Sequence, residues 1–188
     1  DCGGYKTRIK EMLDTELISK SDLIYKTQKA VITALNGNIQ KVESEIETLI
    51  ETDPELKNNF DLIRTIKGVG KIVAARMLAV TSNFKKFSNA RKFNCYAGLA
   101  PFKHESGTSI RGRSRVSHLA NKEIKTVLNL AAFCAIRFNQ ELKLYYEKRV
   151  SEGMKRMSCI NIIRAKIVGR IFAVVKRQTP YDAQTLAA

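Results

Sequence analysis

Hydrophobic positions recur at helical spacing in two long segments, the first of which lies in the N-terminal third of the chain. Its apolar residues follow one another in steps of four, three, four and three positions: Leu35, Ile39, Val42, Ile46 and Leu49. This is the spacing of a heptad repeat. We therefore predict a helix over residues 5–51 and interpret it as a coiled-coil linker or dimerisation arm. An ordinary amphipathic helix packed on its own domain is the alternative. Asn36-Gly37-Asn38 predicts a break or kink.

The second apolar stripe lies near the C-terminus, in a helix predicted from Ser158 to Arg177. One face of that helix is apolar, and Pro180 ends it. The stripe consists of Ile160, Ile163, Ile167, Ile171 and Val174. Five basic residues are expected largely off this stripe: Arg164, Lys166, Arg170, Lys176 and Arg177.

Shorter patterns predict the remaining elements. Asp53 is the expected N-cap of a helix that starts at Pro54, and Ser88 the expected cap of a later one. The helices are predicted at 54–64, from the glycine turn to Val80, from Ser88 to Tyr96, at 121–138 and at 140–152. Glycines and Pro101 make residues 98–117 an irregular loop or a small hairpin.

Together these elements predict an all-α fold. It is a helical domain with a helix-hairpin-helix element and a small loop or hairpin insertion, preceded by a long coiled-coil-like helical arm. The expected boundaries are 1–63 for the helical linker or arm, 64–178 for the main domain and 179–188 for a flexible tail.

Charge is divided unevenly along the chain, whose net charge is +15. Residues 1–63 hold 8 Lys/Arg and 12 Asp/Glu, whereas residues 64–177 hold 25 Lys/Arg and 5 Asp/Glu. A basic half this extreme indicates a polyanion-binding protein. A membrane surface is a weaker alternative, because the basic helices also carry apolar faces typical of a core, and no apolar run is long enough to span a bilayer.

Carboxylates are scarce in the basic half. Its acids are Glu105, Glu123, Glu141, Glu147 and Glu152. A two-metal nuclease needs several converging carboxylates. We therefore predict no metal site in these residues and expect any Mg²⁺ ligands to come from another domain or chain. The chain starts at Asp1 rather than Met, which suggests a fragment and agrees with that expectation.

The four cysteines are widely spaced: Cys2, Cys95, Cys134 and Cys159. No Cys-x-x-Cys pair occurs, so neither a zinc site nor a disulfide framework is predicted. Cys134 and Cys159 lie in apolar helical contexts and are expected in the core. A reducing, cytoplasmic environment fits this cysteine usage.

Ile66-x-Gly68-Val69-Gly70, followed by Ala74, has the pattern of a helix-hairpin-helix element. The glycines permit a tight turn that directs backbone N–H groups outward at the start of the next helix, where phosphate oxygens bind well. Lys67 and Lys71 flank the turn and could pair with phosphates as point charges. A glycine-rich turn that only joins two packed helices is the alternative. We predict nucleic-acid contacts at Lys67, Gly68, Gly70 and Lys71.

Ser106 lies beside Gly107 in a basic segment and is the candidate nucleophile. A serine attacks a phosphodiester only when it is activated and the phosphate charge is neutralised. The basic residues that could contact phosphate are Lys103, Arg111, Arg113 and Arg115. The three arginines alternate, so an extended strand would place them on one face. His104 and His118 could assist, but spacing alone does not distinguish Ser106 from an ordinary turn residue.

Several of these motifs resemble one known family. The residues that carry the resemblance are Gly68-Val69-Gly70, Phe84, Phe87, Ala90-Arg91, Tyr96-Ala97-Gly98-Leu99-Ala100-Pro101, Ser106-Gly107, Tyr145-Tyr146 and Gly153. Residues 66–176 thereby resemble the C-terminal transposase domain of the DEDD-type insertion-sequence transposases of the one-hundred-and-ten class, the RNA-guided bridge recombinases. The residues before Ile66 resemble the helical linker of those proteins.

The resemblance implies a DNA transposase or recombinase. It implies that Ser106 is a catalytic nucleophile that joins covalently to a DNA strand. It also implies an N-terminal domain, missing here, whose Asp-Glu-Asp-Asp tetrad binds Mg²⁺. The implied partner is a structured guide RNA. The implied assembly is a homo-oligomer such as a dimer or tetramer. This chain alone is then expected to be inactive. A non-enzymatic helix-hairpin-helix module that binds DNA or RNA is the alternative.

Overall fold

The computed structural model describes Gly4, Thr7, Arg8, Glu11 and residues 23–106, 110–116 and 119–182, with the backbone alone for 102–106 and 110–115. The chain divides into two compact units, Asp1–Thr52 and Asp53–Ala188. This division falls earlier than the boundary predicted after residue 63. The difference arises because residues 54–64 form a helix whose apolar side chains Phe60, Leu62 and Ile63 are buried in the second unit.

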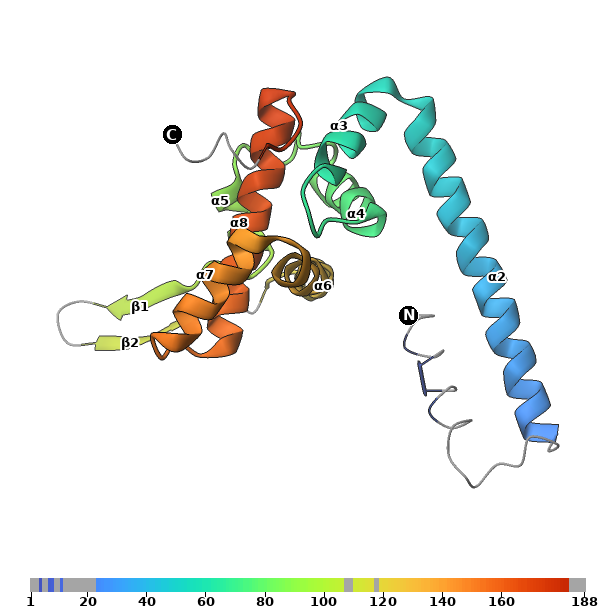
Figure 1. The fold of residues 1–188 in the computed structure, drawn as a ribbon, viewed down its shortest axis with the longest axis horizontal. Helices are drawn as coiled ribbons and strands as arrows, with labels where there is room; N and C mark the ends of the chain where they lie inside the picture. The colour runs from blue at the N-terminus through green and yellow to red at the C-terminus, as the bar shows by residue number, and fades with distance from the viewer. Residues whose placement is uncertain are drawn as a thin grey trace. The chain divides into compact units, whose positions relative to one another are not determined.

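In the first unit, helix α2 (Leu23–Thr52) is a single element of 30 residues (Figure 1). The break predicted at Asn36-Gly37-Asn38 is wrong, because the helix continues through Gly37. One interior glycine costs about 1 kcal/mol relative to alanine, which a long helix can absorb. Three positions of the apolar stripe are exposed: Val42 is 60%, Ile46 40% and Leu49 59% exposed.

The second unit consists of helices and one hairpin within the part that the structure describes. Its helices are α3 (Pro54–Arg64), α4 (Lys71–Thr81), α5 (Ala90–Tyr96), α6 (Lys122–Phe138), α7 (Gln140–Ser151) and α8 (Arg156–Arg177). The hairpin is formed by β1 (Phe102–Ser106) and β2 (Ile110–Arg115). The predicted all-α class with a small hairpin insertion is thus confirmed. Helix α8 is central, because α3, α5, α6 and α7 all contact it (Figure 1).

The apolar stripe predicted on α8 is buried. Ile163, Ile167 and Ile171 have no exposed surface, and each such side chain contributes about 1.5–3 kcal/mol when it leaves water. Arg164 and Arg170 are buried as well, at 4% and 8% exposure. This departs from the expectation that the basic residues lie off the buried face, because helices pack around α8 on several sides.

Side chains cap the starts of α3 and α5 in the second unit. The Oδ1 atom of Asp53 accepts hydrogen bonds from the amides of Glu55 at 2.8 Å and Leu56 at 3.2 Å, which confirms the predicted N-cap. Helix α5 is capped by Asn89, whose Oδ1 accepts from the amide of Lys92 at 2.9 Å. The cap predicted at Ser88 is wrong by one residue, because Asn89 is the side chain that reaches the first-turn amide.

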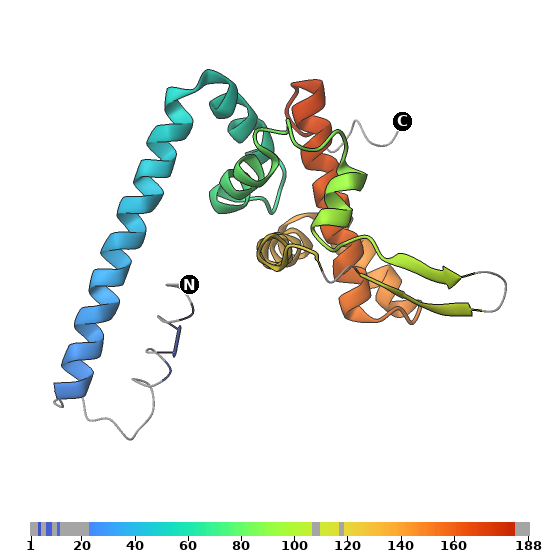
Figure 2. The same cartoon turned by 180° about the vertical axis from the view of Figure 1, so that it is seen from behind.

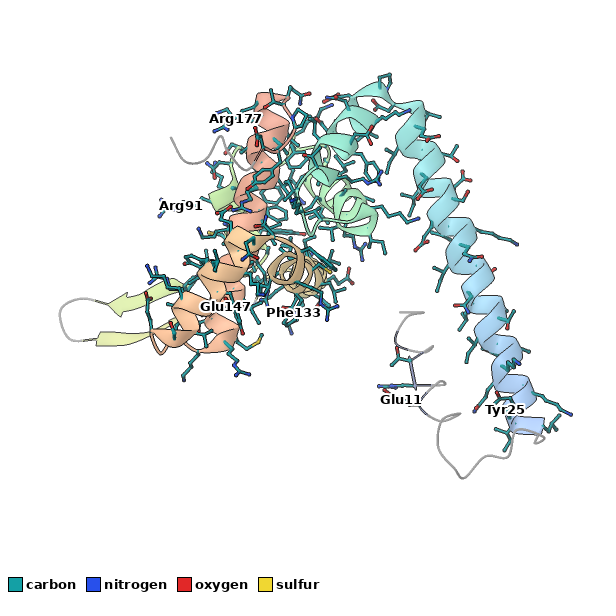
Figure 3. The ribbon with its side chains drawn as sticks, in the orientation of Figure 1. Glu11, Tyr25, Arg91, Phe133, Glu147 and Arg177 are labelled. Carbon is teal, nitrogen blue, oxygen red and sulfur yellow. The ribbon has the colours of Figure 1, made fainter. Side chains whose placement is uncertain are left out.

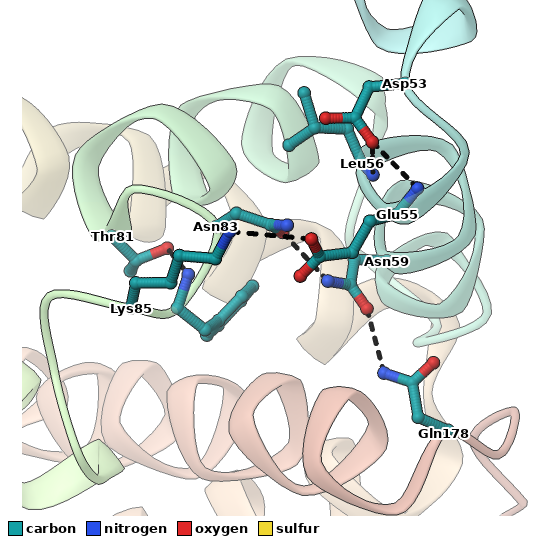
Figure 4. Close-up of polar contacts among 9 residues, drawn as sticks. Asp53, Glu55, Leu56, Asn59, Thr81, Asn83, Lys85 and Gln178 are labelled. Atoms are coloured by element: carbon teal, nitrogen blue, oxygen red, sulfur yellow. Dashed lines mark hydrogen bonds and ion pairs between the residues drawn. The ribbon is translucent and has the colours of Figure 1, made fainter.

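A polar network joins α3 to the segment after α4 and to the end of α8 (Figure 4). Buried Asn59 donates through Nδ2 to Oδ1 of Asn83 at 2.8 Å and accepts from Nε2 of Gln178 at 3.0 Å. Asn83 lies between Ser82 and Phe84, and all three residues have positive φ, from 48° to 63°. The network therefore stabilises a left-handed turn that L-residues rarely adopt.

Aromatic rings pack this turn and α5 against α8. Phe84 meets Phe172 edge to face at 5.0 Å between centroids, and Phe93 lies 5.7 Å from Phe172. Phe87 contacts Phe93 at 5.2 Å and Tyr96 at 5.2 Å. Such pairs add about 0.5–1.5 kcal/mol each beyond simple burial. Phe84 and Phe87, which carry part of the family resemblance, are half-buried residues that pack against the core.

The cysteines differ in burial. Cys159 on α8 is fully buried, as predicted. Cys134 on α6 is exposed, so its expected core position is wrong. Helix α6 directs a different face inward, which is formed by Ile124, Leu128, Ala131, Ala132 and Ala135.

The two glycines of the turn between α3 and α4 have different surroundings. Gly68 has a φ of +96°, and a Cβ there would lie 2.6 Å from Cα of Ala135 on α6. Gly70 has a φ of −89°, and a Cβ there would meet nothing within 4 Å. Gly68 is therefore required by packing and backbone conformation, whereas Gly70 is not.

We predict that Gly68→Ala lowers the free energy of unfolding by about 2–4 kcal/mol, because the added methyl must displace helix backbone and the φ is unfavourable. Gly70→Ala should cost less than about 1 kcal/mol, since only its role as N-cap changes. Urea denaturation of both variants checks this. Equal losses would show that Ala135 does not approach Gly68 in solution.

Candidate nucleic-acid interface

The hairpin places Ser106 at its outer end. Strands β1 and β2 pair antiparallel, with Ser106 opposite Ile110 and Glu105 opposite Arg111. Both views show the hairpin projecting from the helices of the second unit (Figures 1 and 2). Gly107 lies outside the described residues. The backbone thus brings Ser106 and the predicted basic residues of this segment into one hairpin: Lys103, Arg111, Arg113 and Arg115.

The pairing of the two strands is irregular. Phe102 is opposite Arg115 and His104 is opposite Gly112, so β2 holds one more residue than β1 in this interval. An extra residue of this kind interrupts the alternation of faces along a strand. The register is therefore irregular beside Arg113, and the shared face of Arg111, Arg113 and Arg115 stays a prediction.

A close backbone approach fixes the base of the hairpin on the side of β1. Gly98 has a φ of +66°, and a Cβ there would lie 2.6 Å from Cβ of Ala120 and 3.0 Å from Cγ1 of Val116. Leu99 beside it is buried at 2% exposure. From α8, Nδ2 of Asn161 donates to the carbonyl oxygen of Leu99 at 2.7 Å. The chain entering β1 is thereby held between α8 and the segment that follows β2.

The chain leaving β2 is tied to α5. The amide of Asn121 donates to the carbonyl oxygen of Tyr96 at 2.9 Å, and its Nδ2 donates to Tyr96 Oη at 2.9 Å. Its Oδ1 caps α6 by accepting from the amide of Ile124 at 3.1 Å. Helices α5, α6 and α8 therefore set where the hairpin, and Ser106 with it, stands.

The second candidate region is the turn of residues 65–70 between α3 and α4. Lys67, Gly70 and Lys71 are exposed. No side chain caps α4, and its first turn contains no acidic residue. Ala74 is fully buried, which permits close helix packing. Figures 1 and 2 place this turn and the hairpin at separate positions in the second unit, so the structure does not combine them into one site.

An open cavity of about 950 Å³ lies at the base of the hairpin. Its lining includes Lys122, Lys125, Asn129, Asn161 and Arg164. Burial lowers the pKa of the Arg164 guanidinium below its usual value, because it penalises the charged form. Sequence reasoning missed this residue, since the helical pattern shows the apolar face of α8 but not which polar positions its neighbours cover.

Basic side chains are also exposed away from the cavity. Figure 3 shows Arg91 pointing outward from α5, and Arg177 lies near the end of α8. Lys86 lies 5.4 Å from the ring of Tyr96. These positions extend the positive surface of the second unit beyond the residues predicted from motifs.

Side-chain groupings and helix hydropathy bear on metal and membrane binding. Within the described part of the chain, no three His, Cys, Asp or Glu side chains are grouped so that they could hold a metal ion. His118 lies outside the described residues, and His104 is placed by its backbone in β1. Among the described helices, none is long and apolar enough to cross a bilayer.

The elements from the end of α3 through α7, which include both candidate regions, also match a known family. Residues 60–147 match the family described as Transposase IS116/IS110/IS902 family. This transposase match begins at buried Phe60 on α3, ends in α7, and contains the turn, the hairpin and Ser106.

Similar proteins extend the likeness beyond the transposase match. The chain is 29% identical over 149 residues to the pilin gene-inverting protein of Moraxella lacunata. This alignment covers 78% of this chain and 46% of that protein. It is 24% identical over 163 residues to an uncharacterised 43.6 kDa protein of insertion element IS110 from Streptomyces coelicolor, covering 87% and 39%. The chain therefore spans less than half the length of these relatives.

Proposed function

We propose that this chain is part of a DNA recombinase in which the second unit binds DNA and Ser106 is the nucleophile that cuts and rejoins strands. The transposase match across the hairpin is the observation that supports this best. The name of the Moraxella relative, a gene-inverting protein, agrees with a recombination reaction. Ser106 stands at the end of β1 in a projecting basic hairpin, which is a position that a DNA strand can reach.

In the proposed reaction, Oγ of Ser106 attacks the phosphorus of one phosphodiester. The bond between that phosphorus and one deoxyribose oxygen breaks, and a serine–DNA phosphodiester forms. The serine proton passes to a base, and the departing oxygen takes up a proton. A hydroxyl of the exchanging strand then attacks the same phosphorus and releases Ser106. The number of phosphodiester bonds is unchanged, so no external energy source is needed.

The resemblance also implies Mg²⁺, which no group of side chains in the described residues fits. No step of the proposed reaction is therefore assigned to a metal held by this chain. Carboxylates elsewhere in the full-length protein would supply such a site. The basic residues of the hairpin would neutralise phosphate charge from this side.

The alternative is a non-enzymatic module that only holds DNA or RNA. It shares the basic surface and the turn between α3 and α4, but it requires no reactive serine. The two functions therefore differ at Ser106 alone.

We predict that Ser106→Ala in the full-length protein lowers recombination at least about a thousandfold and leaves DNA affinity within about twofold, because only the attacking oxygen is removed. Recombination of a reporter DNA and anisotropy of labelled DNA measure the two effects. Ser114→Ala in β2 is the matched control and should retain activity. If Ser106→Ala recombines normally, the non-enzymatic module is the better description.

A denaturation-resistant protein–DNA adduct is the direct sign of the covalent step. It should form with the unaltered protein and with Ser114→Ala, and map to Ser106. Strong DNA binding without any adduct in the presence of Mg²⁺ and the cognate RNA would contradict the nucleophile assignment.

We further propose that the turn at Gly70 binds a backbone phosphate at the start of α4. Open space surrounds the Gly70 Cα, and no side chain caps the helix. The positive end of the helix dipole favours an anion there. Lys67 and Lys71 add positive charge on either side. The tight packing of Gly68 against α6 keeps this turn in place.

We predict that Gly70→Val with Lys71→Ala weakens DNA binding about tenfold, equally for unrelated sequences, because phosphate contacts read no bases. The slope of log K against log salt should fall by about 0.9 on duplex DNA. Lys57→Ala, at an exposed lysine on α3, is the matched control. A loss that depends on DNA sequence would show that the turn contacts bases.

The exposed stripe on α2 supports a proposal about assembly. Val42, Ile46 and Leu49 are at heptad spacing and exposed in the single chain, so a second helix could cover them. We propose a coiled-coil contact between copies that yields a dimer or tetramer.

A structured guide RNA, as the resemblance implies, remains part of the proposal and would appear as an RNA requirement in the recombination assay.

We predict that Val42→Asp with Ile46→Asp raises the dissociation constant of the oligomer at least about tenfold, because buried charges oppose the helix contact. Sedimentation of the whole chain measures it. Gln40→Asp with Ser44→Asp adds the same charge off the stripe and should leave assembly unchanged. An unaltered chain that stays monomeric at high concentration would contradict the coiled coil.

A further inference from the structure

One basic side chain of the second unit is buried with only neutral partners. Arg164 on α8 is 4% exposed. Its Nη2 donates to Oδ1 of Asn129 at 2.6 Å, and its Nη1 donates to Oδ1 of Asn161 at 3.4 Å. Its Nε has no hydrogen-bond partner among the described residues. The ion pairs found among those residues do not include Arg164. Among the described residues, the positive charge of the Arg164 guanidinium therefore has no acidic partner.

Arg170, six residues further along α8, is also buried, but it is paired with an acidic side chain. It is 8% exposed, and its Nη2 lies 2.7 Å from each carboxylate oxygen of Glu141. Its guanidinium also lies 5.1 Å from the ring of Tyr181. A buried charge is strongly unfavourable unless it is paired in this way. Arg164 stays protonated near neutral pH, and no ion pair among the described residues includes it.

The cavity at the base of the hairpin provides space for that anion. It has a volume of about 950 Å³, and Arg164 lines it together with both amide side chains to which it is bonded, so the guanidinium lies in the cavity wall. Lys122 and Lys125 line it too. The described lining residues include no Asp or Glu. Among the described lining residues, no acidic side chain therefore balances the positive charge of the cavity.

One helix start adds to this charge. Helix α8 begins at Arg156, next to the lining residues Met157 and Ser158. No side chain caps α8, and its first turn has no acidic residue. The positive end of the α8 dipole therefore lies beside the cavity, where it favours an anion. The start of α6 adds less, because Asn121 caps it and Glu123 lies in its first turn.

Much of the remaining lining is apolar. Leu99, Pro101, Val116 and Ile162 line it, and Pro101 and Val116 directly precede β1 and follow β2. Cavities that hold small organic ligands have volumes of about 300–1,000 Å³. The space therefore admits a sugar and a base as well as a phosphate. A phosphate alone would leave the apolar wall uncovered.

We propose that this cavity binds one nucleotide of a DNA strand, with its phosphodiester against Arg164, Lys122 and Lys125 and its sugar and base against the apolar wall. The inference rests on the proposed DNA-binding function and adds the place where a strand is held. Because β1 runs from this cavity to Ser106, a strand held here is led toward the nucleophile. A stacked duplex cannot insert a base, so the cavity takes a single-stranded or unstacked segment.

The test uses the whole chain and a short fluorescent single-stranded DNA, with anisotropy measured over a range of salt concentrations. Arg164→Met should weaken binding about tenfold to a hundredfold and reduce the salt slope by about 0.7, as expected for one lost phosphate contact. Lys176→Met removes the same charge from an exposed position on α8 and should change affinity less than about twofold. Arg164→Lys should fall between the unaltered chain and Arg164→Met.

Thermal unfolding without DNA separates a binding role from a structural one. Arg164→Met should leave Tm unchanged or raise it, because it removes a charge that lacks a partner. Arg170→Met should lower Tm by roughly 5 °C or more, since it breaks a buried ion pair. A similar fall in Tm for Arg164→Met, with DNA binding intact, would show that the guanidinium is structural and overturn the inference.

Other outcomes are equally decisive. If the unaltered chain binds DNA and Arg164→Met binds it equally well, the cavity inference fails while the proposed function stands. If the unaltered chain binds no DNA, both fail. Inorganic phosphate and thymidine monophosphate are the competitors. Competition by either at the affinity of the strand would assign the cavity to a free anion or nucleotide instead. An Arg164-dependent preference for RNA over DNA would assign it to RNA.

Discussion

Burial of one face of α8 is the constraint on which the second unit depends. Ile163, Ile167 and Ile171 are fully enclosed, and helices that come before and after the hairpin in sequence meet on this one helix. That packing positions the hairpin, because Asn161 of α8 donates a hydrogen bond to the carbonyl oxygen of Leu99. A residue far away in sequence thus helps to fix the strand that ends at Ser106.

Two glycines fix the positions of the two candidate regions. They do so because they let the chain pack closely against neighbouring residues, not because they make it flexible. Gly68 leaves no room for a side chain against Ala135, and Gly98 leaves none against Ala120. Each fixes a surface segment on the helical core beneath it. The glycines of the turn between α3 and α4 therefore have separate tasks. Gly68 secures the turn, and only Gly70, which faces open space, is available to admit a phosphate.

The sequence predicted the elements whose causes are local. Heptad and helical spacing located α2 and α8, and the chemistry of Asp53 and Pro54 located the start of α3. It failed where the cause lies elsewhere in the fold. Helix α2 continues through Gly37 because the helix as a whole outweighs one weak position. The pairing of β1 with β2 has an irregular register, which no single strand encodes. Arg164 is buried because helices cover α8 on several sides, and an apolar stripe reports only one of them.

The match to the transposase family ends at residue 147, before α8 begins, yet α8 contributes both Asn161 and Arg164. Arginines at a protein surface act through water, where salt and a high dielectric weaken their attraction for phosphate. A guanidinium in a buried wall acts through a medium of lower dielectric, so the same charge has a stronger effect. An anion in the cavity would offset the cost of burying this charge. On this argument the exposed hairpin receives a strand, and α8 behind it supplies the charge that holds the strand in place.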